Sequence, residues 1–168
     1  MRPPSRITDR HSPDELTASG RPDPVRQVMI PKNGGGERAL GIPTIRDRVV
    51  ETAAKLLLEP IFEADFEDKA YGYRPARGAA DAVRDVYWHL SRGYTDVVDV
   101  NLSRYFDSIP HDELLKSVAR HVADGSVLRL ITLLLKAPIE ERGGDGKRRM
   151  VGGKRNKRGT PQGGVMTP

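Results

Sequence analysis

The chain has 168 residues, which is the length of a single domain able to bury a core of its own. Its net charge of +5 favours a partner with negative charge, such as a nucleic acid. The sequence contains no cysteine, which excludes disulfides, thiolate metal sites and thiol nucleophiles, and no apolar run long enough for a signal peptide or a membrane span. We therefore expect a cytoplasmic protein that does not enter a membrane.

The first predicted elements are a leader and a β-hairpin. Residues 1–24 are rich in proline, serine and charge and show little periodicity, which predicts disorder. Residues 25–43 contain two short apolar stretches around Asn33 and three glycines, the pattern of a hairpin. Lys32 and Arg38 flank this turn, where two cations on facing strands can close on a polyphosphate. The alternative interpretation is an ordinary charged hairpin.

Two helices are predicted next, separated by a loop over residues 63–78. The first begins at Thr44, three residues before Asp47 in a capping-box-like start, and is stopped by Pro60. Its expected buried stripe is Val49, Val50, Ala53, Leu56 and Leu57. The second helix covers residues 79–93. Its expected buried stripe is Ala79, Val83, Val86 and Leu90.

The loop between these helices contains a mixture of arginine and tyrosine. Arg74 and Arg77 lie close in sequence to Tyr71 and Tyr73. Guanidinium and aromatic groups together are suited to stacking on bases and pairing with phosphates. The alternative interpretation is that the tyrosines pack in the core and Pro75 only shapes the loop.

Residues 97–115, VVDVNLSRYFDSIPHDELL, predict a short strand, a polar turn and the start of a helix. Side chains alternate along a strand, so the two expected faces are Val98, Val100 and Leu102 on one side and Val97, Asp99 and Asn101 on the other. A carboxylate at the end of such a strand can bind magnesium, whereas an asparagine binds it much less well. The placing is typical of a catalytic strand.

Two further helices are predicted over residues 111–122 and 126–137. From Pro138 onward the chain is basic and rich in glycine, and we expect no hydrophobic period that could build further core. The basic run at residues 147–158 favours phosphate or an acidic surface, unless it is only a solvated loop. Gln162 precedes two glycines, so its amide can lie against a ligand. A bare glycine turn is the alternative.

Four segments in this order closely resemble the bacterial group II intron reverse transcriptases, also called intron-encoded maturases. They read PVRQVMIPKNGGGERALGIPTIRDRVV, LLLEPIFEADFEDKAYGYRPARGAADAV, VVDVNLSRYFDSIPHDELL and RGTPQGGVMTP. The resemblance covers about residues 24–168. It implies an α+β fold, a right-hand polymerase with fingers over residues 25–93 and a partial palm over residues 94–168. Within that palm, residues 138–164 are expected to form the basic, glycine-rich loop.

The resemblance also shows what this sequence does not contain. In the family, a palm hairpin with a Tyr-x-Asp-Asp motif follows the Pro-Gln-Gly-Gly segment, and a helical thumb comes after it. The 168 residues contain neither of them. We therefore expect a palm truncated before the Tyr-x-Asp-Asp hairpin, with association through the incomplete palm.

Roles for individual residues follow from the resemblance. Lys32 and Arg38 correspond to the pair that grips the incoming triphosphate. Gln162 is similar to the glutamine that lies against the nucleotide sugar, and Phe106, with Tyr105 beside it, resembles the aromatic gate that rejects a 2′-hydroxyl. The residues expected to contact template or other RNA are Arg74, Arg77, Lys154, Arg155, Lys157 and Arg158.

The position of the family's first metal-binding aspartate is Asn101, and the backbone carbonyl of Leu102 accompanies it. Two-metal phosphoryl transfer needs anionic ligands that hold two magnesium ions together, and asparagine offers one neutral oxygen. Asp99 is two residues back, about 6–7 Å along an extended strand, which is too far to substitute. Asp107 matches a second acid of the motif that fixes the turn. We therefore expect Mg²⁺, the family's cofactor, to bind poorly here.

Three functions are weighed from the sequence, and the third, a general basic nucleic-acid-binding protein unrelated to polymerases, is disfavoured by the order of the motifs. The first is an RNA-directed DNA polymerase of the group II intron type, inactive as an isolated fragment, whose partners would be an RNA template, a DNA primer and deoxynucleotides. The alternative is a non-catalytic, maturase-like remnant that binds structured intron RNA. The motif order favours the first function, and Asn101 favours the second.

Overall fold

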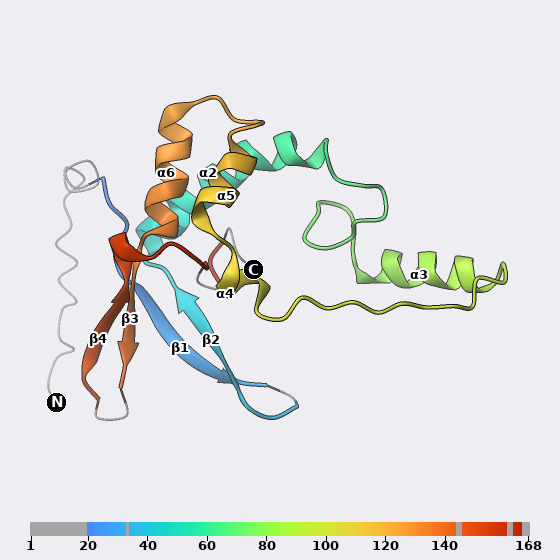
Figure 1. Cartoon of the computed structure of the whole chain (residues 1–168), viewed down its shortest axis with the longest axis horizontal. Helices are drawn as coiled ribbons and strands as arrows, with labels where there is room; N and C mark the ends of the chain where they lie inside the picture. Colours follow the sequence, from blue (N-terminus) through green and yellow to red (C-terminus); the bar gives the residue numbers. More distant parts are fainter. Residues whose placement is uncertain (1–19, 33, 144–145, 161–162, 166–168) are drawn as a thin grey trace, which may run out of the picture.

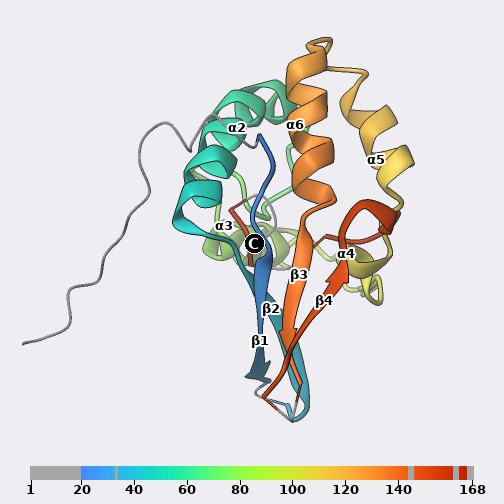
Figure 2. The ribbon, with the colours of Figure 1, turned by 90° about the vertical axis from the view of Figure 1, so that its left-hand side faces the viewer.

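The computed structural model describes residues 20–32, 34–143, 146–160 and 163–165. A four-stranded sheet lies at the centre of the fold, in the order β2-β1-β3-β4. Helices gather at one end of this sheet, and two hairpins project away from them at the other end (Figures 1 and 2). The predicted α+β class is therefore confirmed at the level of a mixed fold with a small sheet.

The predicted first hairpin is confirmed. Strands β1 (Val25–Pro31) and β2 (Glu37–Ile42) pair antiparallel, from Arg26 opposite Ile42 to Pro31 opposite Glu37. Gly35 and Gly36 both have positive φ, 88° and 78°, a backbone conformation that side chains disfavour and glycine accepts. The glycines in the sequence are therefore what allows the chain to reverse here.

A second hairpin follows Pro138, where the sequence predicted only a basic loop. Strand β3 (Pro138–Arg142) runs parallel to β1, and β4 (Arg148–Gly152) returns antiparallel to β3. All five residues of β4 are exposed, so backbone pairing holds this strand with little burial of apolar surface. The expectation that residues 138–164 form a loop is therefore wrong for the two strands at the start of this range. Backbone hydrogen bonds between neighbouring strands stabilise them, and such pairing leaves no hydrophobic period in the sequence.

This pairing crosses the expected boundary between fingers and palm. Strand β1 comes from the expected fingers, and β3 comes from the expected palm, yet the two lie side by side in one sheet. Strands from both expected units therefore lie in one sheet, and the division into fingers and palm stays a prediction.

Helix α2 (Ile45–Glu63) begins as predicted and ends later. Thr44 is its N-cap: the Oγ1 atom accepts the Asp47 N–H at 3.3 Å and donates to the Asp47 carboxylate at 2.8 Å. The helix continues through Pro60, so the predicted stop at that residue is wrong. Proline costs the helix a hydrogen bond but its φ is compatible with helical backbone.

The buried face of α2 also differs from the predicted stripe. Its buried residues are Asp47, Glu51, Ala54 and Leu58, whereas Val49, Leu56 and Leu57 are exposed. Ala54 and Leu58 give the helix a narrow apolar contact, and only one side of α2 is covered by the rest of the described chain. Apolar periodicity alone did not identify which side that is.

The hydrophobic core joins α2 to two further helices, α5 (His111–Val118) and α6 (Gly125–Leu135). The buried cluster consists of Leu58, Val118, Val122, Ile131 and Leu135. Asp124 caps α6, because its Oδ1 atom accepts the N–H groups of Ser126 and Val127 at 2.7 and 3.1 Å. Both helices were predicted from periodicity, and α5 ends four residues earlier than expected.

Helix α3 (Ala79–Leu90) forms but stands away from this core (Figure 1). No residue of α3 is buried, so the predicted buried stripe is wrong. The segment 94–102 that follows has no regular secondary structure, so the predicted strand is also wrong. Both elements carry apolar side chains that the described part of the chain does not cover.

Candidate nucleotide and nucleic-acid interface

The tip of the first hairpin presents two cations. Arg38 lies opposite Ile30 in the strand register, and Lys32 is two residues after Ile30, so both side chains lie on one face of the hairpin. Both residues are exposed, and neither forms an ion pair with another described residue. The turn between them is closed by a hydrogen bond from the Lys32 N–H to Gly36 O at 3.0 Å. Two cations held on one rigid turn can bind one polyphosphate.

The segment around Gln162 packs against this hairpin. Gln162 itself lies outside the described residues, but Gly163 packs so closely on β2 that a Cβ would stand 2.2 Å from Leu40 Cδ1. Two residues later, the Val165 N–H donates to the Glu51 carboxylate at 2.8 Å. Burial raises the pKa of Glu51, and the Val165 N–H opposes that rise. These contacts bring the neighbours of Gln162 to the base of the hairpin.

The preceding segment, residues 157–160, is bound to the turn at residues 106–111. Three backbone hydrogen bonds of 2.9 Å join them, from His111 N–H to Lys157 O, from Gly159 N–H to Ile109 O and from Thr160 N–H to Phe106 O. The His111 ring, only 1% exposed, also lies 2.7 Å from Gly159 O through Nε2. A carbonyl only accepts, so Nε2 carries the proton.

Phe106 is therefore fixed beside the segment that leads to Gln162. It belongs to the short helix α4 (Tyr105–Ser108), where its ring packs edge-on against Tyr105 with the centroids 5.5 Å apart. Phe106 is half-buried and Tyr105 is exposed. The structure thus brings the surroundings of two predicted nucleotide-binding residues together through backbone contacts.

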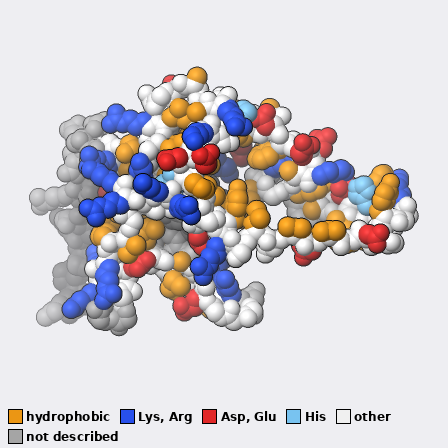
Figure 3. Space-filling model, in the orientation of Figure 1, with side chains coloured by type: hydrophobic (Ala, Val, Ile, Leu, Met, Phe, Trp, Pro, Cys, Tyr) orange, Lys and Arg blue, Asp and Glu red, His pale blue; other side chains and the backbone are white. Residues whose placement is uncertain are grey.

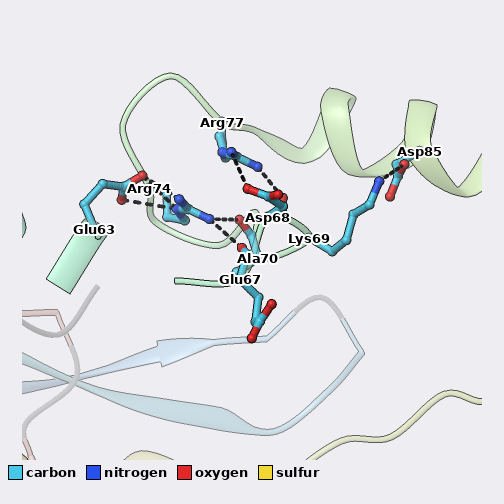
Figure 4. Close-up of polar contacts among 8 residues, drawn as sticks. All are labelled: Glu63, Glu67, Asp68, Lys69, Ala70, Arg74, Arg77 and Asp85. Carbon is cyan, nitrogen blue, oxygen red and sulfur yellow. Dashed lines mark hydrogen bonds and ion pairs between the residues drawn. The ribbon is translucent and has the colours of Figure 1, made fainter. Parts of the chain in front are cut away.

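Arg74 is the most enclosed of the predicted RNA-binding residues (Figure 4). Its side chain is 5% exposed and reaches Glu63 through Nε and Nη2, with a shortest distance of 2.6 Å. Its Nη1 atom donates to Glu67 O at 2.7 Å and to Ala70 O at 3.0 Å. The guanidinium also lies 5.2 Å from the centre of the Phe66 ring. Arg74 therefore holds the loop after α2 in shape.

Arg77 lies in the same loop and is more open. It donates to the backbone carbonyl of Asp68, and its Nη2 atom is 3.8 Å from the Asp68 carboxylate (Figure 4). The two tyrosines of this loop do not pack in the core: Tyr73 is exposed and Tyr71 is half-buried. Template contact by Arg74 or Arg77 stays a prediction, and Arg77 has the more accessible guanidinium of the two.

The enclosed position of Arg74 leads to a prediction about stability. The Arg74 guanidinium holds the pKa of Glu63 below its ordinary value of 4.5. A lowered carboxylate pKa contributes stability above the unfolded pKa, and this contribution is lost as the pH falls through the folded pKa. We expect Arg74→Lys to lower the urea midpoint at neutral pH and to reduce the further loss on acidification, because lysine cannot bridge Glu63 and two carbonyls.

The control for that prediction is Arg77→Lys, which removes the same group from the same loop at a more exposed position. We expect it to change the midpoint less than Arg74→Lys does. The opposite result would be an unchanged urea midpoint for Arg74→Lys together with weaker RNA binding by this variant. That result would show that Arg74 contacts RNA and does not hold the loop in shape.

The basic run lies at the edge of the sheet. After β4 the chain enters the short 3₁₀ helix η1 (Gly153–Arg155). Four side chains here are exposed and form no ion pair with described residues: Lys154, Arg155, Lys157 and Arg158. Lysine and arginine side chains gather over this side of the molecule (Figure 3). The backbone contacts of residues 157–160 described above place this run directly beside the turn that carries Phe106.

The position expected to bind metal is exposed. Asn101 and Leu102 lie in the segment without secondary structure, and Asp99 lies there as well. In the described residues no group of three or more histidine and acidic side chains is placed to hold a metal ion. One neutral amide oxygen with one backbone carbonyl does not match the anionic donors that a pair of magnesium ions needs. The residues present therefore do not fit a two-metal site.

Sequence reasoning missed three residues that organise this region: Glu51, His111 and Gly159. Glu51 stands in a helix on a face that looks polar, and His111 is a single histidine after a proline, so neither belongs to a periodic pattern. The close fit of Gly159 against the backbone of Asp107 depends on two segments far apart in sequence. The sequence signal available for this contact was the basic run followed by Gly-Thr-Pro. That signal does not indicate which other segment of the chain it would contact.

Most of this chain is similar in sequence to known proteins. The family model for reverse transcriptase (RNA-dependent DNA polymerase) matches residues 30–168. Protein YkfC of Escherichia coli (strain K12) is 39% identical over 162 residues, which cover 92% of this chain and 40% of that protein. Group II intron-encoded protein LtrA of Lactococcus lactis subsp. cremoris is 33% identical over 148 residues, 88% of this chain and 23% of LtrA.

A plant relative shows the same pattern of partial coverage. Nuclear intron maturase 1, mitochondrial, of Arabidopsis thaliana is 32% identical over 127 residues, which cover 68% of this chain and 18% of the maturase. The chain thus spans two fifths or less of the length of these relatives. None of the helices in the described residues is long and apolar enough to cross a membrane.

Proposed function

Since the chain belongs to the reverse transcriptase family, we propose that it is the nucleotide-gripping and RNA-holding part of a group II intron-type RNA-directed DNA polymerase. The predicted resemblance to group II intron-encoded proteins and maturases is confirmed. In this proposal Lys32 and Arg38 bind the triphosphate of an incoming deoxynucleotide. Phe106 and Gln162 lie beside its sugar, and the basic run holds structured RNA.

One observation carries the proposal. Residues 157–160 contact the turn that bears Phe106, and Gly163 contacts the hairpin that bears Lys32 and Arg38. This supports the proposal, because described residues on either side of Gln162 lie against the two elements that carry the other residues expected to bind the nucleotide. A protein that only used its positive charge to bind nucleic acid would not need this arrangement.

The chemistry of Asn101 favours a role without catalysis for the isolated chain. The second candidate function, an RNA-binding remnant related to maturases, keeps the basic run and the hairpin and does not need the missing carboxylates. The two candidates share the RNA-binding step, so that step is tested first.

RNA binding is expected to weaken steeply as the salt concentration rises. Each phosphate contact contributes about −0.7 to −0.9 to the slope of log affinity against log salt. Replacing Lys154, Arg155, Lys157 and Arg158 with alanine should therefore flatten the slope by about 3 if all four contact phosphate. The measurement is fluorescence anisotropy of a structured, labelled RNA titrated at several salt concentrations.

A matched control separates position from total charge. Four cations that form ion pairs elsewhere are Lys55, Lys69, Arg84 and Lys116. Replacing them with alanine also lowers the net charge from +5 by four. We expect this variant to keep most of the slope. An equal loss in both variants would show that the run contributes only general charge.

A further inference from the structure

A pocket lies on the face of the first hairpin opposite to Lys32 and Arg38. Its volume is about 200 Å³, several times the roughly 30 Å³ that one water molecule occupies in the liquid. Its floor is formed by residues of strands β1, β2 and β3: Gln27, Ala39, Gly41 and Ile139. Side chains alternate along a strand, so Lys32 and Arg38 lie on the other face. The pocket is therefore separate from the proposed triphosphate grip.

The other wall of this pocket comes from helix α4 and the segment 156–160. Its members are Asp107, Asn156, Arg158, Gly159 and Thr160. The walls are joined by backbone hydrogen bonds, because β1 pairs with both β2 and β3, and residues 157–160 are bonded to the turn at residues 106–111. The pocket therefore lies between elements that pair with one another, and is not a strand or helix face without a neighbour.

Two polar atoms of the pocket residues lack hydrogen-bond partners. Gln27 Oε1 and Thr160 Oγ1 are closed off from solvent, and neither has a partner among the described residues. Buried polar groups in folded proteins nearly always have one. We therefore expect a polar occupant in this pocket.

Two charged side chains of the pocket are free to contact such an occupant. Asp107 and Arg158 are exposed, and neither side chain forms a hydrogen bond or an ion pair with another described residue. The backbone of Arg158 is fixed by a β-bridge with Pro110 and by its N–H, which donates to Asn156 Oδ1 at 3.3 Å. A fixed backbone reduces the entropy that binding costs.

Guanine matches these two side chains. Its O6 and N7 atoms accept two N–H groups from one arginine, the commonest specific contact between a protein and a base. Its N1–H and N2–H groups are adjacent donors, and a carboxylate accepts two such donors at once. Adenine, cytosine and uracil do not have two adjacent donor groups. Ala39 and Gly41 have no side chain beyond Cβ, so a planar ring can lie against them.

The place of Arg158 in the sequence indicates that this guanine belongs to RNA. Arg158 is the last residue of the basic run, which leaves Lys154, Arg155 and Lys157 for phosphates. Phosphate contacts hold a nucleic acid without sequence preference, and contacts with base edges provide the preference. Proteins read RNA sequence mainly at unpaired bases, because side chains cannot read the deep, narrow major groove of an RNA helix.

We propose that this pocket binds an unpaired guanine of the RNA held by the basic run. Arg158 donates to O6 and N7 of the guanine, and Asp107 accepts N1–H and N2–H. The inference rests on the proposed RNA binding and adds a base preference to it.

The first test uses a labelled RNA hairpin whose loop is uridine apart from one variable base. Fluorescence anisotropy should show that the RNA with guanine binds at least about fivefold more tightly than the all-uridine loop. Equal affinities for all four bases would overturn the guanine pocket and leave the proposed RNA binding intact. Absence of binding to every RNA would overturn both.

Base analogues test the assigned contacts on the unchanged protein, so protein folding does not affect the result. Inosine lacks the N2 amino group, and 7-deazaguanosine lacks N7. Each should bind more weakly than guanosine at the variable position. A preference for guanine that neither analogue reduces would rule out the contacts assigned to Asp107 and Arg158.

Two substitutions connect each contact to its side chain. In Asp107→Asn the difference in affinity between guanosine and inosine should shrink, whereas Asp96→Asn, the same change outside the pocket, should keep it. In Arg158→Lys the difference between guanosine and 7-deazaguanosine should shrink, because lysine cannot contact O6 and N7 together. Arg155→Lys is the control within the same run. Differences that stay at their original size in both Asp107→Asn and Arg158→Lys would overturn the proposal.

Discussion

The purified 168-residue chain is expected to extend no primer on an RNA template, with either magnesium or manganese. The resemblance implies an active site with three acids, one expected at the position of Asn101 and two in a Tyr-x-Asp-Asp motif, and these 168 residues supply none of the three. Loss of one anionic ligand from a two-metal site costs several kcal/mol of transition-state stabilisation, which is about 10³-fold or more in rate. Loss of all three should reduce extension below detection.

The same reasoning predicts that Asn101→Asp alone restores nothing. One carboxylate in an exposed segment without secondary structure does not position two metal ions. We expect activity only when this reversion is combined with a polypeptide that supplies the other two acids, joined to this chain or added to it. The measurement is incorporation of labelled deoxynucleotides into a primer annealed to RNA.

A contaminating polymerase is the main source of a false signal in that assay. The control is a chain with Lys32→Ala and Arg38→Ala, purified in parallel. Signal that persists in this variant comes from a contaminant, because the proposed triphosphate grip has been removed. Extension by the unchanged chain that disappears in this variant would show that the isolated chain is an active polymerase, against our prediction.

The parts of the fold that could be predicted are those fixed by local chemistry. Glycines at the turn determined the first hairpin, and the Thr44 cap determined the start of α2. Apolar periodicity located α5 and α6, whose apolar faces meet in the core. In each of these cases the residues that determine the structure are close together in sequence.

The parts that could not be predicted depend on pairing across the chain. Strands β3 and β4 carry charged residues at several positions, and β3 takes its place by pairing with β1, more than a hundred residues earlier. Conversely, residues 97–102 have the composition of a strand but find no partner in the described chain, so they remain unpaired. Strand propensity is a weak signal because a strand needs a neighbour to be stable.

The candidate site also has a part that the sequence predicts and a part that it does not. Its charged and aromatic residues, such as Lys32, Arg38 and Phe106, could be proposed from a motif. The contacts that position them use backbone carbonyls, as in the hydrogen bond between His111 and Gly159. A sequence does not show which carbonyl a buried histidine will reach, so this part of the site required the structure.

Gly159→Ala is expected to destabilise the protein by roughly 3 kcal/mol, because the substitution combines backbone strain with a steric overlap. Gly159 has φ of +77°, and a Cβ there would stand 2.7 Å from the carbonyl oxygen of Asp107. That oxygen belongs to backbone and cannot rotate away as a side chain does. The segment 157–160 must then separate from the turn that carries Phe106.

Gly34→Ala is the matched control for this substitution, because no atom lies within 4 Å of a Cβ at Gly34 and its φ is not left-handed. We expect Gly34→Ala to change the free energy of unfolding, measured by urea denaturation, by less than about 0.5 kcal/mol. Amide hydrogen exchange gives a local measurement: the N–H groups of His111 and Thr160, which bond across the contact, should exchange faster in Gly159→Ala and not in Gly34→Ala. Equal midpoints and equal exchange in the two variants would show that residues 157–160 do not hold the turn, and the main support for one shared nucleotide site would be lost.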